Sequence, residues 1–169
     1  MDSNRRIYVL DAGAFYAGIP FLAALQPGQC WTTEAIFSEV EHIKRSQGIL
    51  EALIDSGSLQ IAQPERRYVE KVISIATRTG DSGKLSKADI SVIALAFGKR
   101  AILITNDYAV ANVATVMNIS VELTSSRHIK ETRKWITYCS ACGKVFEANA
   151  SECILCGNKL KRKYKKKMI

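Results

Sequence analysis

The sequence predicts an α/β fold with a mostly parallel central sheet, followed by a small second unit that a metal ion holds together. Over residues 1–123, short apolar runs suited to strands alternate with longer runs of helical periodicity. This alternation indicates a parallel sheet with helices on both faces, an α/β/α sandwich. Two closely spaced cysteine pairs follow between residues 139 and 156, a pattern typical of a small metal-bound ribbon.

Short runs rich in apolar and β-branched residues are the expected strands. They occupy residues 7–11, 59–63, 101–105 and 119–123. Helices are expected over residues 14–25 (as helix or turn), 32–46, 48–57, 64–78, 86–98 and 107–118. The helix expected over 32–46 illustrates the pattern, because Ile36, Val40 and Ile43 recur at helical spacing and would form one buried stripe.

The composition is that of an ordinary globular protein. The 169 residues are 47% hydrophobic and 24% charged, and no apolar run is long enough to span a bilayer. The apolar run near the N-terminus ends at Asp11 and lacks the length of a signal peptide. These observations predict a cytoplasmic protein with no membrane partner. Cys30 stands apart from the other four cysteines and is expected to be a small buried side chain.

Positive charge is concentrated near the end of the chain. Residues 1–126 carry 12 Lys and Arg against 13 Asp and Glu, a net charge of −1, whereas residues 127–169 carry 12 against 3, a net charge of +9. A concentration of this kind favours binding to a polyanion such as a nucleic acid. For the run KLKRKYKKK alone, a solvated tail without a partner is an equal alternative.

Aspartates follow two of the predicted strands. Asp11 ends the run IYVLD, and Asp107 follows the run ILITN. In open α/β sheets the functional crevice lies beyond the carboxyl ends of the strands, so both side chains would reach it. Helix capping is the alternative role for Asp107. A purely structural role is harder to accept for Asp11, because a buried carboxylate needs a partner.

Two further acids lie on predicted helices. Glu39 falls on the apolar face between Ile36 and Ile43. Asp89 is spaced from Ser86 as in a capping box, and this role alone would explain its presence. Four ionised carboxylates can share one site only with cations between them, and hard ions such as Mg²⁺ take oxygen ligands of this kind. A site of this type supports in-line phosphoryl displacement.

The motifs YVLDAGAF, FSEV, LSKADISVIALA and ILITNDYAVANVA occur in an order that resembles the PIN-domain ribonucleases. The resemblance covers about residues 5–123. It implies a PIN-like nuclease domain whose catalytic site holds Mn²⁺ or Mg²⁺ with Asp11, Glu39, Asp89 and Asp107. Asp81 is a candidate for a further acid at the rim, although a turn residue is the favoured interpretation. Thr105 is a candidate for orienting a carboxylate or a water molecule.

The remaining four cysteines form two C-x₂-C pairs separated by ten residues, and Gly143 or Gly157 follows each pair. Zn²⁺ prefers four such thiolates in a tetrahedron. A unit this small has too little core to fold alone, so one structural zinc ion is expected, held by Cys139, Cys142, Cys153 and Cys156. Because protein fills all four positions, this metal is not expected to be the catalyst. Four reduced cysteines without metal are the alternative.

Basic and aromatic side chains are interleaved around the cysteines. Charges attract phosphates and rings stack on unpaired bases, a combination that favours RNA. The aromatic candidates are Trp135, Tyr138, Phe146 and Tyr164, of which Phe146 is expected to pack inward. The candidate RNA-binding residues are Arg127, Lys130, Arg133, Lys134, Lys144, Lys161, Arg162 and Lys163.

The expected order is a PIN-like nuclease domain (1–123), a linker (124–135), a zinc ribbon (136–160) and a basic tail (161–169). This plan resembles the Nin-one-binding endonucleases of small-subunit ribosome assembly in their compact archaeal form. The resemblance implies metal-dependent cleavage of single-stranded precursor rRNA at the 3′ end of the small-subunit rRNA, with assembly-factor proteins as further candidate partners. The alternatives are an inactive RNA-binding assembly factor, a transcription-associated ribbon protein and a toxin-type PIN ribonuclease. Toxin-type chains generally stop after the PIN domain.

Overall fold

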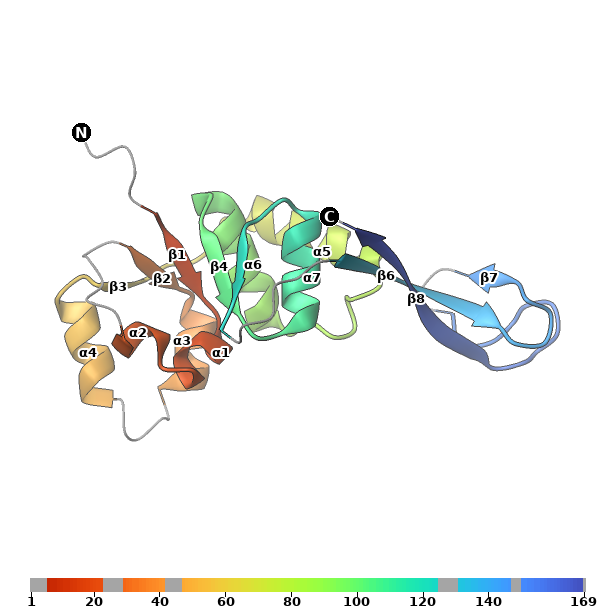
Figure 1. The fold of residues 1–169 in the computed structure, drawn as a ribbon, viewed down its shortest axis with the longest axis horizontal. Helices are drawn as coiled ribbons and strands as arrows, with labels where there is room; N and C mark the ends of the chain where they lie inside the picture. The colour runs from red at the N-terminus through yellow and green to blue at the C-terminus, as the bar shows by residue number, and fades with distance from the viewer. Residues whose placement is uncertain (1–5, 23–28, 42–46, 125–130, 147–149, 169) are drawn as a thin grey trace.

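The computed structural model describes residues 6–22, 29–41, 47–124, 131–146 and 150–168. The strands form two separate sheets, one with five strands and one with three. The five-stranded sheet and its helices form the body of the molecule, and the three-stranded sheet extends from it as an arm (Figure 1). The α/β fold class expected from the sequence is confirmed.

The central sheet is parallel throughout. Its strand order is β3-β2-β1-β4-β5, which places β1 in the middle. In chain order the strands are β1 (Tyr8–Leu10), β2 (Cys30–Thr32), β3 (Leu59–Ile61), β4 (Ile102–Thr105) and β5 (Val121–Leu123). Leu10 lies opposite Ile104, so β1 and β4 end side by side and the residues that follow them are neighbours.

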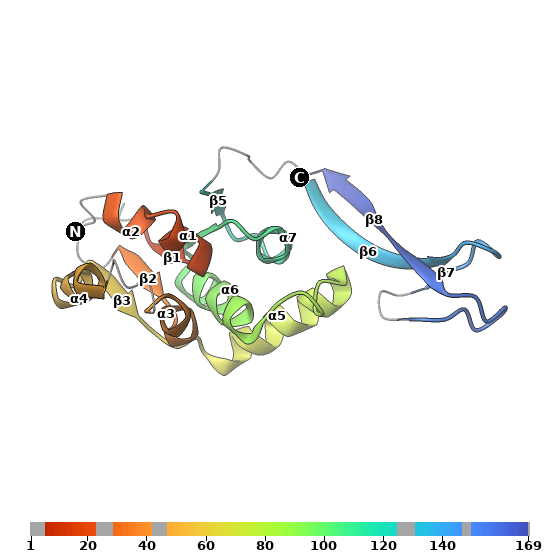
Figure 2. The same ribbon diagram turned by 90° about the horizontal axis from the view of Figure 1, so that it is seen from below.

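The helices connect these parallel strands. They are α1 (Ala12–Tyr16), α2 (Ile19–Leu22), α3 (Glu34–Val40), α4 (Gln47–Asp55), α5 (Arg66–Thr79), α6 (Lys87–Lys99) and α7 (Tyr108–Val116). Figure 2 shows α1 on one side of β1 and α6 on the other, as in a layered α/β/α fold. Among the described helices, none has the length and apolar character needed to cross a membrane.

Strand β2 was not expected from the sequence. Residues 30–32 pair with both β1 and β3, and Thr33 then caps α3 by accepting a hydrogen bond from the N–H of Ile36 at 3.3 Å. The helix predicted from residue 32 therefore starts two residues too early. Three residues are too few to show the alternation that marks a strand, and burial in the sheet decides their conformation. Ile43 of the predicted stripe lies outside the described residues.

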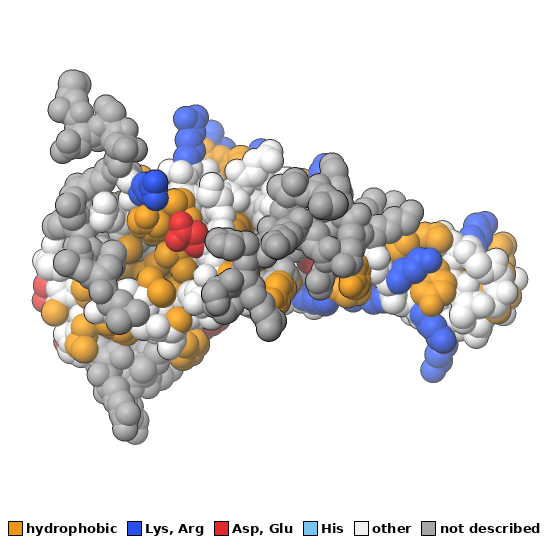
Figure 3. Space-filling model, in the orientation of Figure 1, with side chains coloured by type: hydrophobic (Ala, Val, Ile, Leu, Met, Phe, Trp, Pro, Cys, Tyr) orange, Lys and Arg blue, Asp and Glu red, His pale blue; other side chains and the backbone are white. Residues whose placement is uncertain are grey.

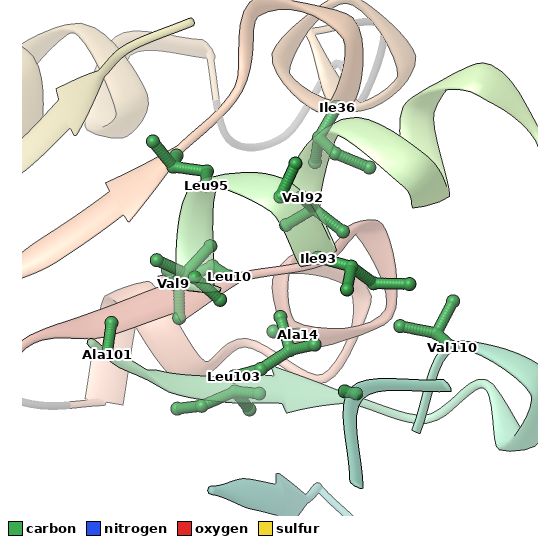
Figure 4. Close-up of a cluster of buried hydrophobic side chains, with 14 of the residues drawn as sticks. Val9, Leu10, Ala14, Ile36, Val92, Ile93, Leu95, Ala101, Leu103 and Val110 are labelled. Carbon is green, nitrogen blue, oxygen red and sulfur yellow. The ribbon is translucent and has the colours of Figure 1, made fainter. Parts of the chain in front are cut away.

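The core is centred on α6 where it crosses the sheet. In Figure 4, Val92 and Ile93 of α6 lie above Leu10 of β1 and Leu103 of β4, and all four side chains are fully buried. Ile36 of α3 closes the cluster from the neighbouring helix. Truncating a side chain of this kind to alanine costs about 2–5 kcal/mol of stability. This packing therefore holds β1 and β4 firmly in place, and the acids follow the carboxyl ends of these two strands.

The arm consists of β6 (Glu131–Cys139), β7 (Val145–Phe146) and β8 (Leu160–Met168), in the order β7-β6-β8. β6 and β8 pair antiparallel along all nine residues. β6 therefore begins inside the segment expected to be a linker, and β8 runs through the segment expected to be a basic tail. Pairing gives the charged run a partner strand, and the T-shaped pair of Trp135 and Tyr164 supports it at a centroid distance of 5.4 Å. The division into domains remains a prediction.

The middle of the β6–β8 ladder is attached to the loop between α5 and α6. Nη2 of Arg162 donates a hydrogen bond to the carbonyl oxygen of Gly80 at 2.8 Å. Trp135 lies under two cations, with Nζ of Lys84 4.1 Å and Cζ of Arg162 5.1 Å from the ring centroid. These contacts connect the arm to the segment that leads into α6.

Candidate active site and metal centre

Asp11 is buried at the carboxyl end of β1, the middle strand of the central sheet. It follows β1, its side chain is only 4% exposed, and its N–H donates to the carbonyl oxygen of Ile104 at 3.0 Å. One carboxylate oxygen accepts from the N–H of Ala12 at 2.7 Å and the other from the hydroxyl of Thr105 at 2.5 Å. Asp11 therefore has partners for its burial, and it also caps α1.

Thr105 joins the two strand ends. Its Oγ1 donates to Oδ2 of Asp11 and accepts a hydrogen bond from the N–H of Asp107 at 3.0 Å. One hydroxyl therefore fixes both the buried carboxylate and the backbone that carries the second acid. The sequence marked Thr105 as a candidate for orienting a carboxylate, and the structure shows the hydrogen bond through which it does so.

Asp107 caps α7 through one of its two carboxylate oxygens. Oδ1 accepts from the N–H groups of Ala109 at 2.6 Å and Val110 at 3.1 Å. Oδ2 makes no hydrogen bond to any residue that the structure describes. Capping uses Oδ1 and metal binding would use Oδ2, so the two roles predicted for this residue are compatible.

Asp89, at the start of α6, also uses only one of its carboxylate oxygens for capping. Oδ2 accepts from the N–H of Ser86 at 2.7 Å, and Oγ of Ser86 accepts from the N–H of Asp89 at 3.1 Å. This is the capping box expected from the sequence, with Asp at the usual Glu or Gln position. Within the described part of the chain, Oδ1 of Asp89 has no hydrogen-bond partner, so it remains available to a ligand.

The charges of these three acids are close enough to interact. Burial raises the pKa of the Asp11 carboxyl above its ordinary value, and the hydrogen bonds from Thr105 and Ala12 oppose this effect. The negative charges of Asp89 and Asp107 raise the pKa of Asp11 further. A divalent cation among the three carboxylates would remove this repulsion, so their oxygens fit such an ion.

Glu39 stands apart from this group. It is exposed on α3, and its charge is not among the causes that shift the pKa of Asp11.

The three aspartates themselves are not tightly gathered. Over the described ranges, the four cysteines form the only group of three or more possible ligands with all ligand atoms within 4.8 Å. Mg²⁺ keeps several waters and needs only one or two direct carboxylates, so a looser arrangement suits it.

Asp81 belongs to the core and not to this site. It is buried, and Oδ2 accepts a hydrogen bond from Nδ2 of Asn112 on α7 at 2.7 Å. The favoured interpretation as a turn residue accounts for its place after α5, and the bond to Asn112 adds a fixed contact between the loop and α7. Asn112 was not singled out from the sequence. Its signal is a single polar residue within the apolar run AVANVAT.

The four arm cysteines form two similar turns that face each other. In each turn a glycine with positive φ, Gly143 or Gly157, donates its N–H to the carbonyl oxygen of the first cysteine, at 2.9 Å and 2.8 Å respectively. Positive φ favours glycine, which is why one follows each pair. Sγ of Cys139 lies 3.4 Å from Sγ of Cys156, and Sγ of Cys142 lies 3.6 Å from Sγ of Cys153. These distances are near the roughly 3.8 Å expected around one tetrahedral Zn²⁺, so the group can hold a metal ion.

Without a metal the four thiols cannot ionise together. The N–H of Cys142 lowers the pKa of Cys139 to about 6. For Cys156 the N–H of Asn158 acts in the same direction, but the neighbouring sulfurs of Cys139 and Cys153 outweigh it and raise the pKa to about 12. A bound cation stabilises all four thiolates, so binding should release protons and weaken in acid.

The candidate RNA-binding residues have different surroundings. Arg127 and Lys130 lie outside the described residues, as do the side chains of Arg133 and Lys134 on β6. Lys144, Lys161 and Lys163 are exposed, and Nζ of Lys163 lies 4.5 Å from the Tyr138 ring centroid. Arg162 contacts the α5–α6 loop. Phe146, expected to pack inward, is half-buried. Figure 3 shows basic side chains distributed over the arm.

The sequence of this chain is similar to those of known ribonucleases. Residues 8–98 match the family model described as the PIN domain of ribonuclease, and this match covers more than half of the chain. Endoribonuclease Nob1 of Methanocaldococcus jannaschii is 36% identical over 166 residues, which cover 97% of this chain and 81% of that protein.

Two further relatives extend the comparison. Endoribonuclease Nob1 of Pyrococcus abyssi is 33% identical over 139 residues, 82% of this chain and 81% of the relative. Ribonuclease VapC1 of Thermoplasma acidophilum is 31% identical over 163 residues, 95% of this chain and 80% of the relative. The resemblance expected from the four acidic motifs is confirmed, and the chain belongs to the PIN-domain ribonucleases.

Proposed function

We propose that this chain is an endoribonuclease that cleaves single-stranded precursor rRNA at the 3′ end of the small-subunit rRNA during ribosome assembly. Asp11, Asp89 and Asp107 hold the catalytic Mg²⁺ or Mn²⁺ in this proposal, and Glu39 orients the attacking water or completes the site. The relatives named Endoribonuclease Nob1 support this activity. The arm holds one structural Zn²⁺ through its four cysteines and contacts the RNA with its basic side chains.

The observation that carries the proposal is the hydrogen-bond chain from Asp107 through Thr105 to Asp11. It fixes two acids on adjacent strand ends, and the capping box fixes Asp89, whose charge acts on Asp11. Asp89 and Asp107 each keep one oxygen free of hydrogen bonds within the described residues. Each residue can therefore cap its helix with one carboxylate oxygen and bind a metal ion with the other. A bound divalent ion would supply a nucleophilic water and charge for the developing phosphate oxygens.

The arrangement of the arm supports a role in positioning RNA and not in catalysis. All four candidate metal ligands are protein thiols, which leaves no open position for a substrate or a water. Lys144, Lys161 and Lys163 are exposed, and Lys163 lies near Tyr138, a combination that suits phosphate and base contacts. Arg162 has a second task, because it also binds the Gly80 carbonyl oxygen in the α5–α6 loop.

Cleavage of an RNA that spans the small-subunit 3′ end would test the proposal. The full chain would be assayed with Mn²⁺ beside Asp11→Asn, which keeps the shape of the side chain and removes its charge. Asp55→Asn is the matched control, because Asp55 is an exposed aspartate at the end of α4. We expect one specific cut that Asp11→Asn reduces at least about 100-fold, since the transition state loses a metal ligand. RNA binding without added Mn²⁺ should be unchanged.

Other outcomes favour other functions. Tight binding without cleavage by any of the proteins would support an RNA-binding assembly factor that uses its acids only as helix caps. Equal cleavage by the wild type and Asp11→Asn would refute the assignment of the site. Efficient cleavage of unrelated RNAs would favour a ribonuclease of broader specificity. The arm does not separate these cases, because the VapC1 relative matches 95% of this chain and must include most of the arm.

A further inference from the structure

Two tyrosines are exposed beside the acids. Tyr108 is 55% exposed and directly follows Asp107, and Tyr16 is 67% exposed and ends the short helix that Asp11 caps. Single exposed apolar side chains are common and need no explanation. Here, however, each of the two helices that start at a strand-end aspartate carries an exposed ring in its first or second turn.

These rings differ from Tyr164, which is also exposed, and from the half-buried Tyr68 and Tyr138. Tyr164 pairs with Trp135, Tyr68 pairs with Phe97 at 5.4 Å, and Tyr138 lies beneath Lys163. Tyr16 and Tyr108, by contrast, have no hydrogen bond, ring contact or cation contact with any described residue. Their faces are available to a ligand, and nothing in the described parts of the chain competes for them.

The backbone beneath both rings is fixed. Asp107 is held by Thr105 on one side and by the N–H groups of Ala109 and Val110 on the other, so the first turn of α7 carries Tyr108 rigidly. Tyr16 lies five residues after Asp11, about 7 Å along a helix axis.

Close packing fixes α1 as well. A Cβ atom on Gly13 would lie 3.3 Å from Cβ and N of Asn106, which shows that α1 and the β4–α7 turn are in close contact at this point. Thr124 also contacts Asn106 by a side-chain hydrogen bond. The two tyrosines are therefore carried by two elements that pack together next to the acids, and their separation is set by the fold.

We propose that Tyr108 and Tyr16 are stacking platforms for unpaired bases of the RNA on the two sides of the phosphate that is cleaved. This proposal rests on the proposed ribonuclease function and adds residues that position its substrate. Aromatic rings stack on bases of any sequence, so the platforms select for structure and not for base identity. Duplex RNA presents no free base faces, so the two rings make the site selective for single strands.

The test uses the full chain in the Asp11→Asn background, so that RNA is bound without being cut. Short RNAs with 2-aminopurine at successive positions report stacking by quenching of its fluorescence. We expect strong quenching at the positions next to each ring. Tyr108→Leu and Tyr16→Leu should each relieve quenching at one position and weaken binding between about 5-fold and 100-fold, as for other stacked bases. The conservative variants Tyr108→Phe and Tyr16→Phe should restore both signals.

Controls separate stacking from damage to the fold. Ile73→Ala changes an apolar side chain on α5 that is 45% exposed and lies on another element, and it should leave quenching and affinity unchanged. Binding to duplex RNA should not respond to any tyrosine variant. If both leucine variants bind and quench like their parent, the stacking proposal is wrong. Stacking changes in a chain whose wild type never cleaves would uphold the platforms and refute the nuclease.

Discussion

The body of the molecule and its arm are stabilised in different ways. The buried hydrophobic cluster takes all its members from the body, between Val9 and Ile119. In the arm, Ile154 of the second cysteine pair is 83% exposed and its neighbour Leu155 is exposed as well. Among the described arm residues only Ile136, Thr137, Cys139 and Cys153 are buried, so the arm depends mainly on its four cysteines and on the β6–β8 ladder. We therefore expect the body to keep its shape under conditions in which the arm unfolds.

Removal of metal should have the largest effect, and it should be confined to the arm. Structural zinc in small domains contributes roughly 10–16 kcal/mol of binding free energy, so Cys139→Ser or a chelator should unfold the arm. The chain has two tryptophans, Trp31 in the body and Trp135 in the arm, and single-tryptophan variants would report each part by fluorescence. We expect the Trp135 signal to change and the Trp31 signal to stay.

Cys30→Ala provides the matched control for this comparison. Cys30 is also a cysteine, but it is buried in β2 of the body, so its loss should lower the stability of the body and leave the metal content at one ion. Parallel loss of both fluorescence signals on chelation would show that the body and the arm fold as one unit.

A cavity in the core should have the reverse effect. Leu103→Ala removes a fully buried side chain of β4 and should lower the free energy of unfolding of the body by about 2–5 kcal/mol. Denaturant titration followed at Trp31 would measure this loss. Metal content and thiol protection of the arm should be unchanged under native conditions. Release of metal by this variant without denaturant would contradict the separation of the two parts.

Protonation of Asp11 should make the unfolding free energy of the metal-free body depend on pH. Its pKa is raised in the folded protein, so the folded state binds the proton more tightly than the unfolded chain does. Stability should therefore decrease as the pH rises from the ordinary pKa of aspartate through the raised one, and increase again on acidification. Asp11→Asn should remove this contribution. The measurement is the difference in unfolding free energy between the wild type and Asp11→Asn across this range.

Divalent metal should stabilise the wild type relative to Asp11→Asn, because it binds only the ionised carboxylate. With Mn²⁺ present the wild type should be the more stable protein above the raised pKa. A difference that does not vary with pH would show that unfolding changes the number of bound protons equally in the two proteins, and the assignment of a raised pKa to Asp11 would be wrong.

The smallest effect is expected where body and arm meet. Arg162→Gln removes the hydrogen bond to the Gly80 carbonyl oxygen and one cation from the Trp135 ring, at a cost of about 1 kcal/mol. Hydrogen exchange should become faster in the α5–α6 loop. Lys161→Gln is the matched control on the same strand, and it should weaken RNA binding without changing exchange in the loop. Equal exchange rates in the two variants would show that Arg162 does not attach the arm.

Much of the body was predictable because its signals are local. The capping box of Ser86 and Asp89 and the aspartates after β1 and β4 are visible in a few residues each, and the structure shows the same contacts. β2 was missed because three residues have no period to detect. The sequence also could not show that one oxygen of Asp107 caps α7 while the other stays free, because this depends on side-chain orientation.

The arm was predictable only in part. Cysteine spacing was sufficient to predict a metal group, since both pairs and their glycines are local features. Residues 161–169 were expected to be a basic tail because six of the first seven are Lys or Arg, and charge hides strand propensity. Only the partner strand, 29 residues earlier at Trp135 opposite Tyr164, gives this segment its conformation.

The nine-residue ladder of β6 and β8 sets a length requirement for the substrate. At about 3.3 Å per residue it spans roughly 30 Å, and both views show it pointing away from the body. Trp135, the fifth residue of β6, and Arg162, the third residue of β8, contact the α5–α6 loop, so the part of the ladder beyond them separates the cysteine turns from the body. An RNA that touches the cysteine turns and the acids at once must extend past this part of the ladder. Oligonucleotides too short to do so can occupy one end only, so affinity should increase in a step once the chain of nucleotides is long enough to reach both.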